Sequence, residues 1–478
     1  MSPETTRSAR AESADPERTV ESAIEDARAA MAAVEEYDQA QVDELARAVG
    51  WAVYEADRCR ELSELAVETT GLGVVEDKYR KKRRKITGAL AEMLGEPTVG
   101  VVERDPENEL VEIAKPVGVV GAVVPSTNPG ATPTLLSMMA VKSRNAILLS
   151  PSPRGRATCE QVVEWVREEL DAVGAPRDLV QMLPPPVSKA KTYALMEQVD
   201  LLQVTGSSDN VRAGQESGTP NYCVGEGNPV AVVDETADVD ATAERIATSK
   251  RFDNGTSCSS EGNAAIVDDV YEPTVAALGR AGGHLLGDGD RRRLRETLFP
   301  HDGDSLNPEA IARSPAEIAE LAGIEDRGAR EADFLMVEGR GVGPEHPMSG
   351  EKIAPVLTVY RAEDFEAALS LTRSILSYEG AGHSAGVHTD SEARARRAGR
   401  EIDVARLLVN QVHSFSNGGH YANGLGATLS EGAGTWGGNQ LDENVSFEKF
   451  YQTTTVARPI EDATEPDPEE LFAPYLAD

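Results

Sequence analysis

The residues from 117 to 204 alternate short apolar runs with longer stretches of helical periodicity. We expect strands at 117–124, 146–149, 179–183 and 201–204, and helices at 133–144, 156–173 and 188–198. Strands that alternate with helices in this way form a parallel sheet with helices on both faces. A second unit of this kind is expected after residue 226. The predicted fold class is therefore α/β, with two doubly wound parallel-sheet domains.

The same patterns divide the 478-residue chain. We expect a disordered lead over about residues 1–16 and a helical layer to residue 97, an arm at 98–115, a dinucleotide-binding domain at 116–226, a catalytic domain at 227–433, and at 434–478 a return segment, an arm strand and an acidic tail. The arm has β-rich ends around the turn-like Asp105-Pro106-Glu107-Asn108. Because a two-stranded ribbon is not stable alone, we expect it to pair with another copy in a homodimer or homotetramer.

The net charge of −34 restricts the possible partners. Acidity of this size repels nucleic acid and anionic membranes, so neither is expected to bind. The carboxylates are spread along the chain, as in a hydrated surface suited to a high-salt cytoplasm. No apolar run is long enough to span a bilayer and no signal peptide is recognised, so we expect a cytoplasmic protein.

Cysteines and lysines add two further expectations. The four cysteines form no CxxC pair, which argues against a disulfide framework and against zinc, and we expect no metal. The basic run from Lys78 to Lys85 is favoured as a solvated helix face, with contact to the phosphates of a nucleotide or of coenzyme A as the alternative.

Three polar turns follow the strands predicted at 117–124, 146–149 and 201–204. Because dinucleotides bind at the carboxyl ends of strands in such sheets, we interpret the turns as one cofactor cleft. No GxGxxG motif follows the first strand. The turns supply the candidate cofactor-binding residues Ser126, Thr127, Ser150, Pro151, Arg154, Gly206 and Ser207.

Cys258 lies between a helix expected at 238–250 and a strand expected at 263–267. Asn254 and Gly255 tolerate positive φ, so a turn here could place the thiol and its backbone N–H beside a reacting carbonyl. A small buried hydrophobic cysteine is the alternative. We treat Cys258 as the candidate nucleophile.

The segment Phe252-Asp253-Asn254-Gly255-Thr256-Ser257-Cys258-Ser259-Ser260-Glu261 resembles the catalytic-cysteine motif of the CoA-acylating branch of the aldehyde dehydrogenase superfamily. Segments 116–129, 145–154, 204–228, 349–357 and 434–444 resemble that branch in the same order. The resemblance implies an aldehyde dehydrogenase-like fold with an oligomerisation arm, NAD or NADP as cofactor and coenzyme A as co-substrate. It also implies that Asn128 donates to the oxyanion and that Glu351 binds the nicotinamide ribose.

A missing carboxylate distinguishes the branches of this superfamily. The general base of the hydrolytic members aligns with Cys223 in Cys223-Val224-Gly225-Glu226-Gly227-Asn228-Pro229. Without that base, a thioester on Cys258 would persist until a thiol attacks it. Glu226 departs from the small or apolar residue usual in the family, and whether it serves as a displaced base is left open.

The expected reaction converts an aldehyde, CoA and NAD(P)+ to acyl-CoA and NAD(P)H. Arg154 follows Pro153 where many relatives carry an acid that binds ribose, which favours NADP slightly. The polar stretch 411–419 and the stretch 434–439 resemble acylating members that act on sulfoacetaldehyde. His413 and Asn417 are the candidate substrate-binding residues, and an anionic head group is expected to suit them.

Three alternatives to this reaction remain open. The chain could be a hydrolytic aldehyde dehydrogenase that releases a free acid. It could be a cysteine acyltransferase or hydrolase without redox chemistry. It could also be a non-catalytic relative that only assembles.

Overall fold

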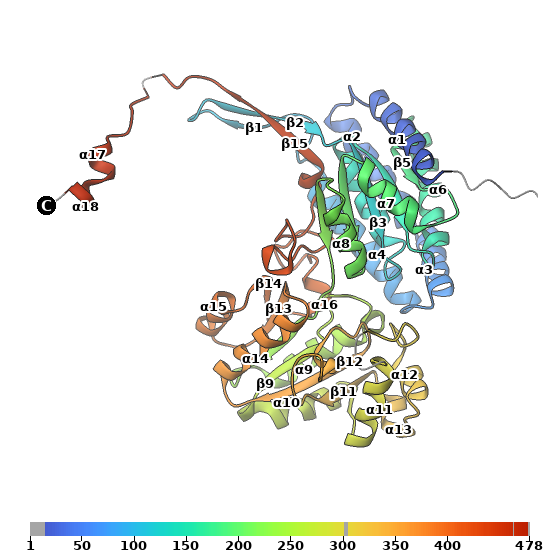
Figure 1. Ribbon diagram of the computed structural model, residues 1–478, viewed down its shortest axis with the longest axis vertical. Coiled ribbons are helices and arrows are strands. Elements are labelled where there is room, and N and C mark those ends of the chain that lie inside the picture. Colours follow the sequence, from blue (N-terminus) through green and yellow to red (C-terminus); the bar gives the residue numbers. More distant parts are fainter. Residues whose placement is uncertain (1–14, 301–304, 462, 477–478) are drawn as a thin grey trace, which may run out of the picture.

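The computed structural model describes residues 15–300, 305–461 and 463–476. The disordered lead expected over about 1–16 lies outside these residues except for Asp15 and Pro16. Two parallel sheets form separate layers with helices on both faces, and an arm projects from one side (Figure 1). The predicted α/β fold with two doubly wound domains is confirmed.

The first domain is built on a five-stranded parallel sheet of order β5-β4-β3-β6-β7. Its strands are β3 (Val119–Val124), β4 (Ala146–Pro151), β5 (Val180–Met182), β6 (Leu201–Thr205) and β7 (Asn221–Val224). Its helices are α1 (Pro16–Ala33), α2 (Gln39–Tyr54), α3 (Ala56–Thr70), α4 (Val75–Met93), α5 (Ala131–Lys142), α6 (Arg156–Ala172), α7 (Lys189–Gln198) and α8 (Ser208–Glu216), with the 3-10 turn η1 (Arg177–Leu179). Helices on both faces explain why β3 and β4 are buried along their whole length.

The second domain is built on a seven-stranded parallel sheet of order β10-β11-β12-β9-β8-β13-β14. Its strands are β8 (Val230–Val233), β9 (Asn263–Val267), β10 (Gly283–Leu285), β11 (Phe334–Glu338), β12 (Val356–Ala362), β13 (Gly382–His388) and β14 (Val404–Val409). Its helices are α9 (Val239–Arg251), α10 (Asp268–Arg280), α11 (Asp288–Leu298), α12 (Pro315–Leu321), α13 (Arg327–Glu331), α14 (Phe365–Tyr378), α15 (Glu392–Glu401) and α16 (His413–Ser416), with the 3-10 turns η2 (Phe252–Gly255) and η4 (Pro347–Ser349). The chain passes from one sheet to the other between β7 and β8, where the boundary at 226/227 was expected.

The arm is a three-stranded antiparallel sheet in which β15 pairs with β2 on the side opposite β1. Its strands are β1 (Gly100–Asp105), β2 (Leu110–Pro116) and β15 (Tyr451–Ala457). Most of β15 is exposed, and the arm extends away from both domains (Figure 1). The return segment includes η5 (Thr435–Gly437) and η6 (Phe447–Phe450), and the expected acidic tail contains two short exposed helical turns, α17 (Pro468–Leu471) and α18 (Ala473–Leu476).

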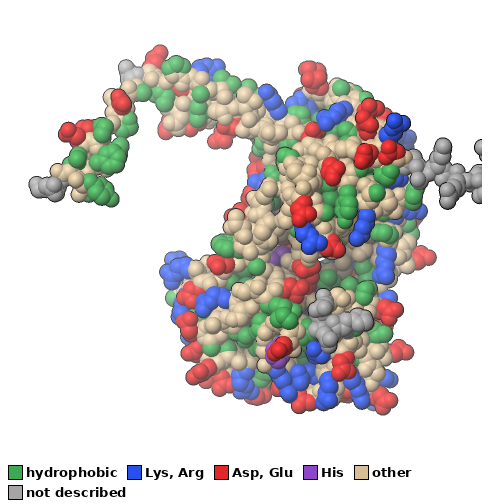
Figure 2. Space-filling view, viewed as in Figure 1, with side chains coloured by type: hydrophobic (Ala, Val, Ile, Leu, Met, Phe, Trp, Pro, Cys, Tyr) green, Lys and Arg blue, Asp and Glu red, His purple; other side chains and the backbone are tan. Residues whose placement is uncertain are grey.

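The prediction of a solvated basic helix is wrong for the lysines of α4. Lys78, Lys81, Lys82 and Lys85 are each 3–5% exposed. Their ammonium groups bond to other parts of the protein, so these four lysines are not free to contact phosphate. Elsewhere, charged side chains of both signs are spread over the visible face of the molecule, which is hollowed between the arm and the second domain (Figure 2). Within the described residues, no helix combines the length and apolar character needed to cross a bilayer.

Candidate active site

The turn that carries Cys258 has an unusual backbone. The helix α9 ends at Arg251, and Asp253, Asn254 and Gly255 follow with φ of 51°, 52° and 64°. Two non-glycine residues in this region cost free energy, so the surrounding structure must hold them there. At Gly255 an added Cβ would lie 2.6 Å from the carbonyl oxygen of Ala354, which explains the glycine. Cys258 follows this turn and leads into β9, as the sequence predicted.

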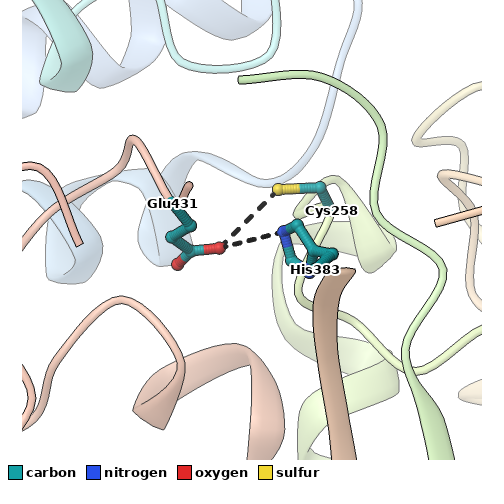
Figure 3. A group of neighbouring side chains, drawn as sticks. All are labelled: Cys258, His383 and Glu431. Carbon is teal, nitrogen blue, oxygen red and sulfur yellow. Dashed lines mark hydrogen bonds and ion pairs between the residues drawn. The ribbon is translucent and has the colours of Figure 1, made fainter. Parts of the chain in front are cut away.

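The thiol of Cys258 faces one carboxylate. Its Sγ lies 3.9 Å from Oε2 of Glu431, and Nε2 of His383 lies 3.3 Å from the same oxygen (Figure 3). That oxygen also accepts hydrogen bonds from Ser259 Oγ at 2.5 Å and from Asn417 Nδ2 at 2.8 Å. Glu431 therefore joins the nucleophile turn, strand β13 and the loop after α16.

Further polar side chains, outside the cluster itself, form hydrogen bonds that fix the positions of its members. The Arg406 side chain donates to Asn417 Oδ1 at 3.1 Å and to the carbonyl oxygen of His383 at 2.8 Å. The hydroxyl of Ser384 lies 2.8 Å from Nδ1 of His383 and 2.9 Å from Nε2 of His413. Asn417 and His413 are almost fully buried, and these bonds occupy the side-chain oxygen and nitrogen of Asn417 and Nε2 of His413.

Charge and burial set the pKa values of the cluster. Burial, followed by the negative charges of Glu431 and Glu351, raises the pKa of the Cys258 thiol well above its usual value. Burial alone would raise the pKa of Glu431 too, but His383 and Arg406 outweigh it and lower that pKa strongly. The cluster as it stands therefore favours a protonated thiol beside an ionised carboxylate.

Two lysines of α4 hold the backbone before Cys258. Oδ2 of Asp253 lies 2.6 Å from Nζ of Lys81 and 3.2 Å from Nζ of Lys78, and its Oδ1 accepts from the Val74 N–H at 2.8 Å. Burial would raise the pKa of Asp253, but the two lysine charges lower it. The Lys78 ammonium also donates to the Thr127 carbonyl oxygen at 3.1 Å. The helix α4 thus ties the nucleophile turn to the β3–α5 loop.

The strand-end turns lie on one edge of the first sheet, because β4, β3 and β6 are neighbours. Ser126 and Thr127 follow β3, and Gly206 and Ser207 follow β6, as predicted, whereas Ser150 and Pro151 are the last two residues of β4 rather than part of the turn after it. Arg154 is exposed and forms no hydrogen bond or ion pair with the described residues. Thr205 Oγ1 lies 3.0 Å from Ser430 Oγ, which places this edge against the loop that carries Glu431.

Asn128 and Glu351 carry polar groups available to a ligand. The side-chain oxygen of Asn128 is buried and has no hydrogen-bond partner among the described residues. Glu351 accepts from the Gly227 N–H at 3.1 Å, and burial followed by repulsion from Glu379 and Glu226 raises its pKa well above the usual value. An added Cβ on Gly227 would lie 2.5 Å from the Cys258 carbonyl oxygen, so the segment that bonds Glu351 touches the nucleophile turn.

The position of the hydrolytic base holds a buried thiol. Cys223 lies in β7 and is 2% exposed, in the interior beside Gly214, and burial raises its pKa to about 12. The exposed Glu226 accepts a hydrogen bond from the Ser208 hydroxyl, whereas the side-chain partner of the Cys258 thiol is Glu431. Among the described residues, neither takes the place of a base beside the thiol.

The sequence prediction missed His383, Glu431 and Arg406. His383 lies in the glycine-rich stretch Gly382-His383-Ser384-Ala385-Gly386, where β13 is fully buried. Glu431 stands alone among small residues in Ser430-Glu431-Gly432-Ala433. A single ionisable residue in an otherwise small or apolar stretch was the available signal.

Comparison with known proteins decides the family. The profile of the aldehyde dehydrogenase family matches residues 2–293. The chain is 45% identical over 440 residues to an acylating sulfoacetaldehyde dehydrogenase of Cupriavidus necator, covering 92% of this chain and 89% of the relative. The chain belongs to the aldehyde dehydrogenase family.

The relatives also identify the branch. The chain is 35% identical over 458 residues to an acetylating succinate-semialdehyde dehydrogenase of Clostridium kluyveri, covering 95% of this chain and 99% of the relative. The crystal structure of an acetylating aldehyde dehydrogenase from Geobacillus thermoglucosidasius matches with a TM-score of 0.89 and 31% identity, covering 94% of this chain and 98% of that one. This member of the family is an oxidoreductase of the CoA-acylating branch and uses NAD(P) and CoA, as the motifs around Cys258 predicted.

The expectation that the protein holds no metal concerns Cys258, His383 and Glu431. Ligand atoms of Cys258, His383 and Glu431 lie within 4.8 Å of one another, as they would around a metal ion. Oε2 of Glu431, however, already accepts hydrogen bonds from Ser259 and Asn417. We interpret the group as a thiol with an acid–base pair, and the absence of a metal stays a prediction.

Proposed function

We propose that the protein oxidises an anionic aldehyde, with sulfoacetaldehyde as the first candidate, to its acyl-CoA through a thioester on Cys258. The sequence identity to the acylating sulfoacetaldehyde dehydrogenase is the observation that supports this substrate. Succinate semialdehyde, in the name of a second relative, is also an anionic aldehyde. The balanced reaction consumes aldehyde, CoA thiol and NAD(P)+ and yields acyl-CoA, NAD(P)H and a proton.

In the first step, the Cys258 sulfur adds to the carbonyl carbon, and the thiol proton would pass to His383 and from there to solvent. The carbonyl oxygen becomes an oxyanion, to which the Cys258 backbone N–H and the Asn128 side-chain amide would donate. Loss of the carbon-bound hydrogen as hydride then leaves a thioester on the sulfur.

The dinucleotide, when bound at the strand ends, would accept that hydride. Ser126, Thr127, Ser150, Pro151, Gly206 and Ser207 would line its cleft at the edge that faces Cys258. Glu351 would hold a ribose hydroxyl, because its carboxyl group lies beside the nucleophile turn and, with one oxygen on the Gly227 N–H, has the other for a new partner. The exposed Arg154 would pair with a 2′-phosphate, which favours NADP over NAD.

In the second step, the CoA thiol attacks the thioester and releases Cys258. His383 would accept the proton of the CoA thiol, because its Nε2 lies 3.3 Å from the Glu431 oxygen that faces the Cys258 thiol. Water lacks an equivalent base at Cys223, so hydrolysis should be slow. The hydrolytic dehydrogenase is therefore disfavoured, and membership of the aldehyde dehydrogenase family disfavours the non-redox cysteine enzyme.

His413 and Asn417 were expected to bind the substrate. Their buried bonds to Ser384, Ser259, Arg406 and Glu431 support a different role, in which they position the walls of the site. We further propose that the exposed arm pairs with a second copy, giving a homodimer or homotetramer, because β15 and β1 leave open sheet edges. Light scattering would reveal this, and a monomer at high salt would contradict it.

The test compares Cys258→Ala with the wild-type enzyme under saturating aldehyde. Formation of reduced dinucleotide should require CoA and should disappear in Cys258→Ala, while dinucleotide binding measured by calorimetry should be retained. Reduced dinucleotide formed equally well without CoA, together with release of free acid, would refute the acylating mechanism. Sulfoacetaldehyde, succinate semialdehyde, acetaldehyde and propionaldehyde should be compared, and a clear preference for the two uncharged aldehydes would refute the anionic substrate.

A further inference from the structure

Arg84 lies on α4 beside the two segments that build the nucleophile site. Its guanidinium carbon is 4.4 Å from the ring centre of Phe415 and 6.0 Å from that of Phe252, and these two rings meet edge to face at 4.7 Å. Phe252 begins η2, three residues before the end of that turn. Phe415 lies two residues before Asn417, whose amide donates to Ser259 Oγ at 3.1 Å. Arg84 therefore contacts both walls that converge on Cys258.

The guanidinium of Arg84 has no anionic partner in the described residues. Its Nε is buried and forms no hydrogen bond there. Burial lowers the pKa of Arg84, and the opposing influence comes from Tyr421 rather than from a carboxylate. A partly desolvated cation beside a pair of aromatic rings gains some cation–π stabilisation, but its burial is not compensated by a negative charge. This stands out in a chain with 81 acidic and 47 basic residues.

Neighbouring cations of the site are already engaged. Lys81 is bound to Asp253, the Lys85 ammonium donates to the carbonyl oxygens of Gly418 and Gly419, and Arg406 holds Asn417. Arg84 and Lys85 both lower the pKa of His420, after burial, so positive potential is concentrated at this point. Arg406 also keeps one unpaired nitrogen, Nη1, but its side chain already donates to Asn417 and to the His383 carbonyl oxygen, whereas the Arg84 side chain forms no hydrogen bond with the described residues.

We propose that Arg84 binds the anionic head group of the aldehyde, a sulfonate or a carboxylate, and thereby sets the substrate preference. The proposal rests on the acylating function and on the anionic substrate proposed above. A guanidinium presents N–H groups in a planar fork that matches two oxygens of either anion. Phe252 and Phe415 would exclude water around the pair and strengthen it.

The kinetic test measures kcat/KM for sulfoacetaldehyde and acetaldehyde in wild type, Arg84→Met and Arg84→Lys. Arg84→Met should lower kcat/KM for sulfoacetaldehyde by roughly 10- to 100-fold, the range expected for a charge-assisted hydrogen-bonded contact, and change it by less than about threefold for acetaldehyde. Arg84→Lys keeps the positive charge but not the planar pair of N–H donors, so its kcat/KM for sulfoacetaldehyde should lie between those of the wild type and Arg84→Met. An equal loss for both aldehydes would overturn the proposal.

The matched control is Arg83→Met. Arg83 is the next residue on α4 and also stacks on an aromatic ring, Tyr54 at 4.0 Å, but it donates to the Tyr54 carbonyl oxygen, away from Cys258. Its replacement should leave the preference between the two aldehydes unchanged. The KM for CoA is measured in all variants, because a rise in that KM for Arg84→Met with every aldehyde would assign the guanidinium to a CoA phosphate and overturn the proposal.

A second measurement needs no turnover. Isethionate carries the sulfonate without an aldehyde, and it should slow alkylation of Cys258 by iodoacetamide in wild type and Arg83→Met but not in Arg84→Met, as read by intact mass. Failure to protect the wild type, or equal protection of Arg84→Met, would overturn the role of Arg84. A wild-type preference for uncharged aldehydes would instead refute the anionic substrate proposed above, so the two failures are distinguishable.

Discussion

Lys81→Met should impair catalysis although Lys81 lies far from Cys258 in the sequence and touches no substrate. The lysine is 5% exposed, Asp253 is 1% exposed, and their atoms lie 2.6 Å apart. Breaking one side of a buried ion pair costs ~3–5 kcal/mol. Because Lys78 and the Val74 N–H still bind Asp253, we take the lower end, ~3 kcal/mol.

That loss is comparable with the strain that the turn holds. Asp253 and Asn254 both have positive φ, and each such residue costs ~1–3 kcal/mol. Without Lys81 the left-handed turn should no longer be strongly preferred, and the thiol should shift. Since a displacement of ~1 Å can cost about 10²-fold in rate, we expect kcat to fall by about that factor. The KM values for aldehyde and CoA should change much less.

Lys82→Met is the matched control. Lys82 is 3% exposed on the same helix, but its ammonium donates to Ser63 Oγ at 2.7 Å and has no contact with the nucleophile turn. Both variants should lower the melting temperature. Lys82→Met should keep kcat within about twofold of the wild type, because the Cys258 thiol should not move by the ~1 Å that would slow the reaction. Equal losses of kcat in the two variants, or a Lys81→Met enzyme as fast as wild type, would refute the reasoning.

Three further predictions concern charge. In the enzyme without substrates, the rate of Cys258 alkylation should keep rising with pH beyond the ordinary thiol pKa of 9.0, because the pKa of this thiol is raised. Glu431→Gln should increase that rate at fixed pH, because it removes a negative charge beside the thiol. A midpoint of the pH profile below 9.0 in the wild type would contradict this prediction. Arg154→Ala should reduce kcat/KM for NADP more than for NAD, and an NAD preference that the change leaves untouched would argue against a phosphate contact. Molar KCl should raise the melting temperature, since a Debye length of ~3 Å screens the repulsion within a chain of net charge −34, and a melting temperature that is insensitive to salt would speak against the high-salt interpretation.

The sequence predicted β3, β4, β5 and β6 of the first sheet because each is a short, mostly buried apolar run, but it did not predict β7 (Asn221–Val224). The boundaries were less accurate at α5, which begins at Ala131 and ends at Lys142 rather than spanning 133–144. Proline is tolerated in the first helical turn, so Pro133 does not mark the start. The end is set by Arg144, whose φ of 61° cannot continue a helix.

The interior of the site could not be predicted because its contacts join distant residues. Lys81 and Asp253 are 172 positions apart, and Asn417 and Ser259 are 158 apart. From the local sequence alone, four lysines within eight residues predict a solvated helix face. Only the position of Asp253 in the fold shows why two of them are buried. Cys258 was predictable because its motif is contiguous. His383 and Glu431 were not, because each acquires meaning only beside the thiol.

Glu431 is close enough to Cys258 to act as the base for a catalytic thiol, yet it is poorly suited to take the thiol proton. Its pKa is strongly lowered, so it remains ionised over the neutral range and is a weak base. Its Oε2 also binds Ser259 and Asn417, and protonation there would break bonds that hold two walls of the site. The carboxylate opposes thiolate formation through its negative charge. Glu431 is therefore not the acceptor of the proton of the attacking thiol. We propose that His383, whose Nε2 lies 3.3 Å from Glu431 Oε2, takes this proton, first from Cys258 and then from CoA.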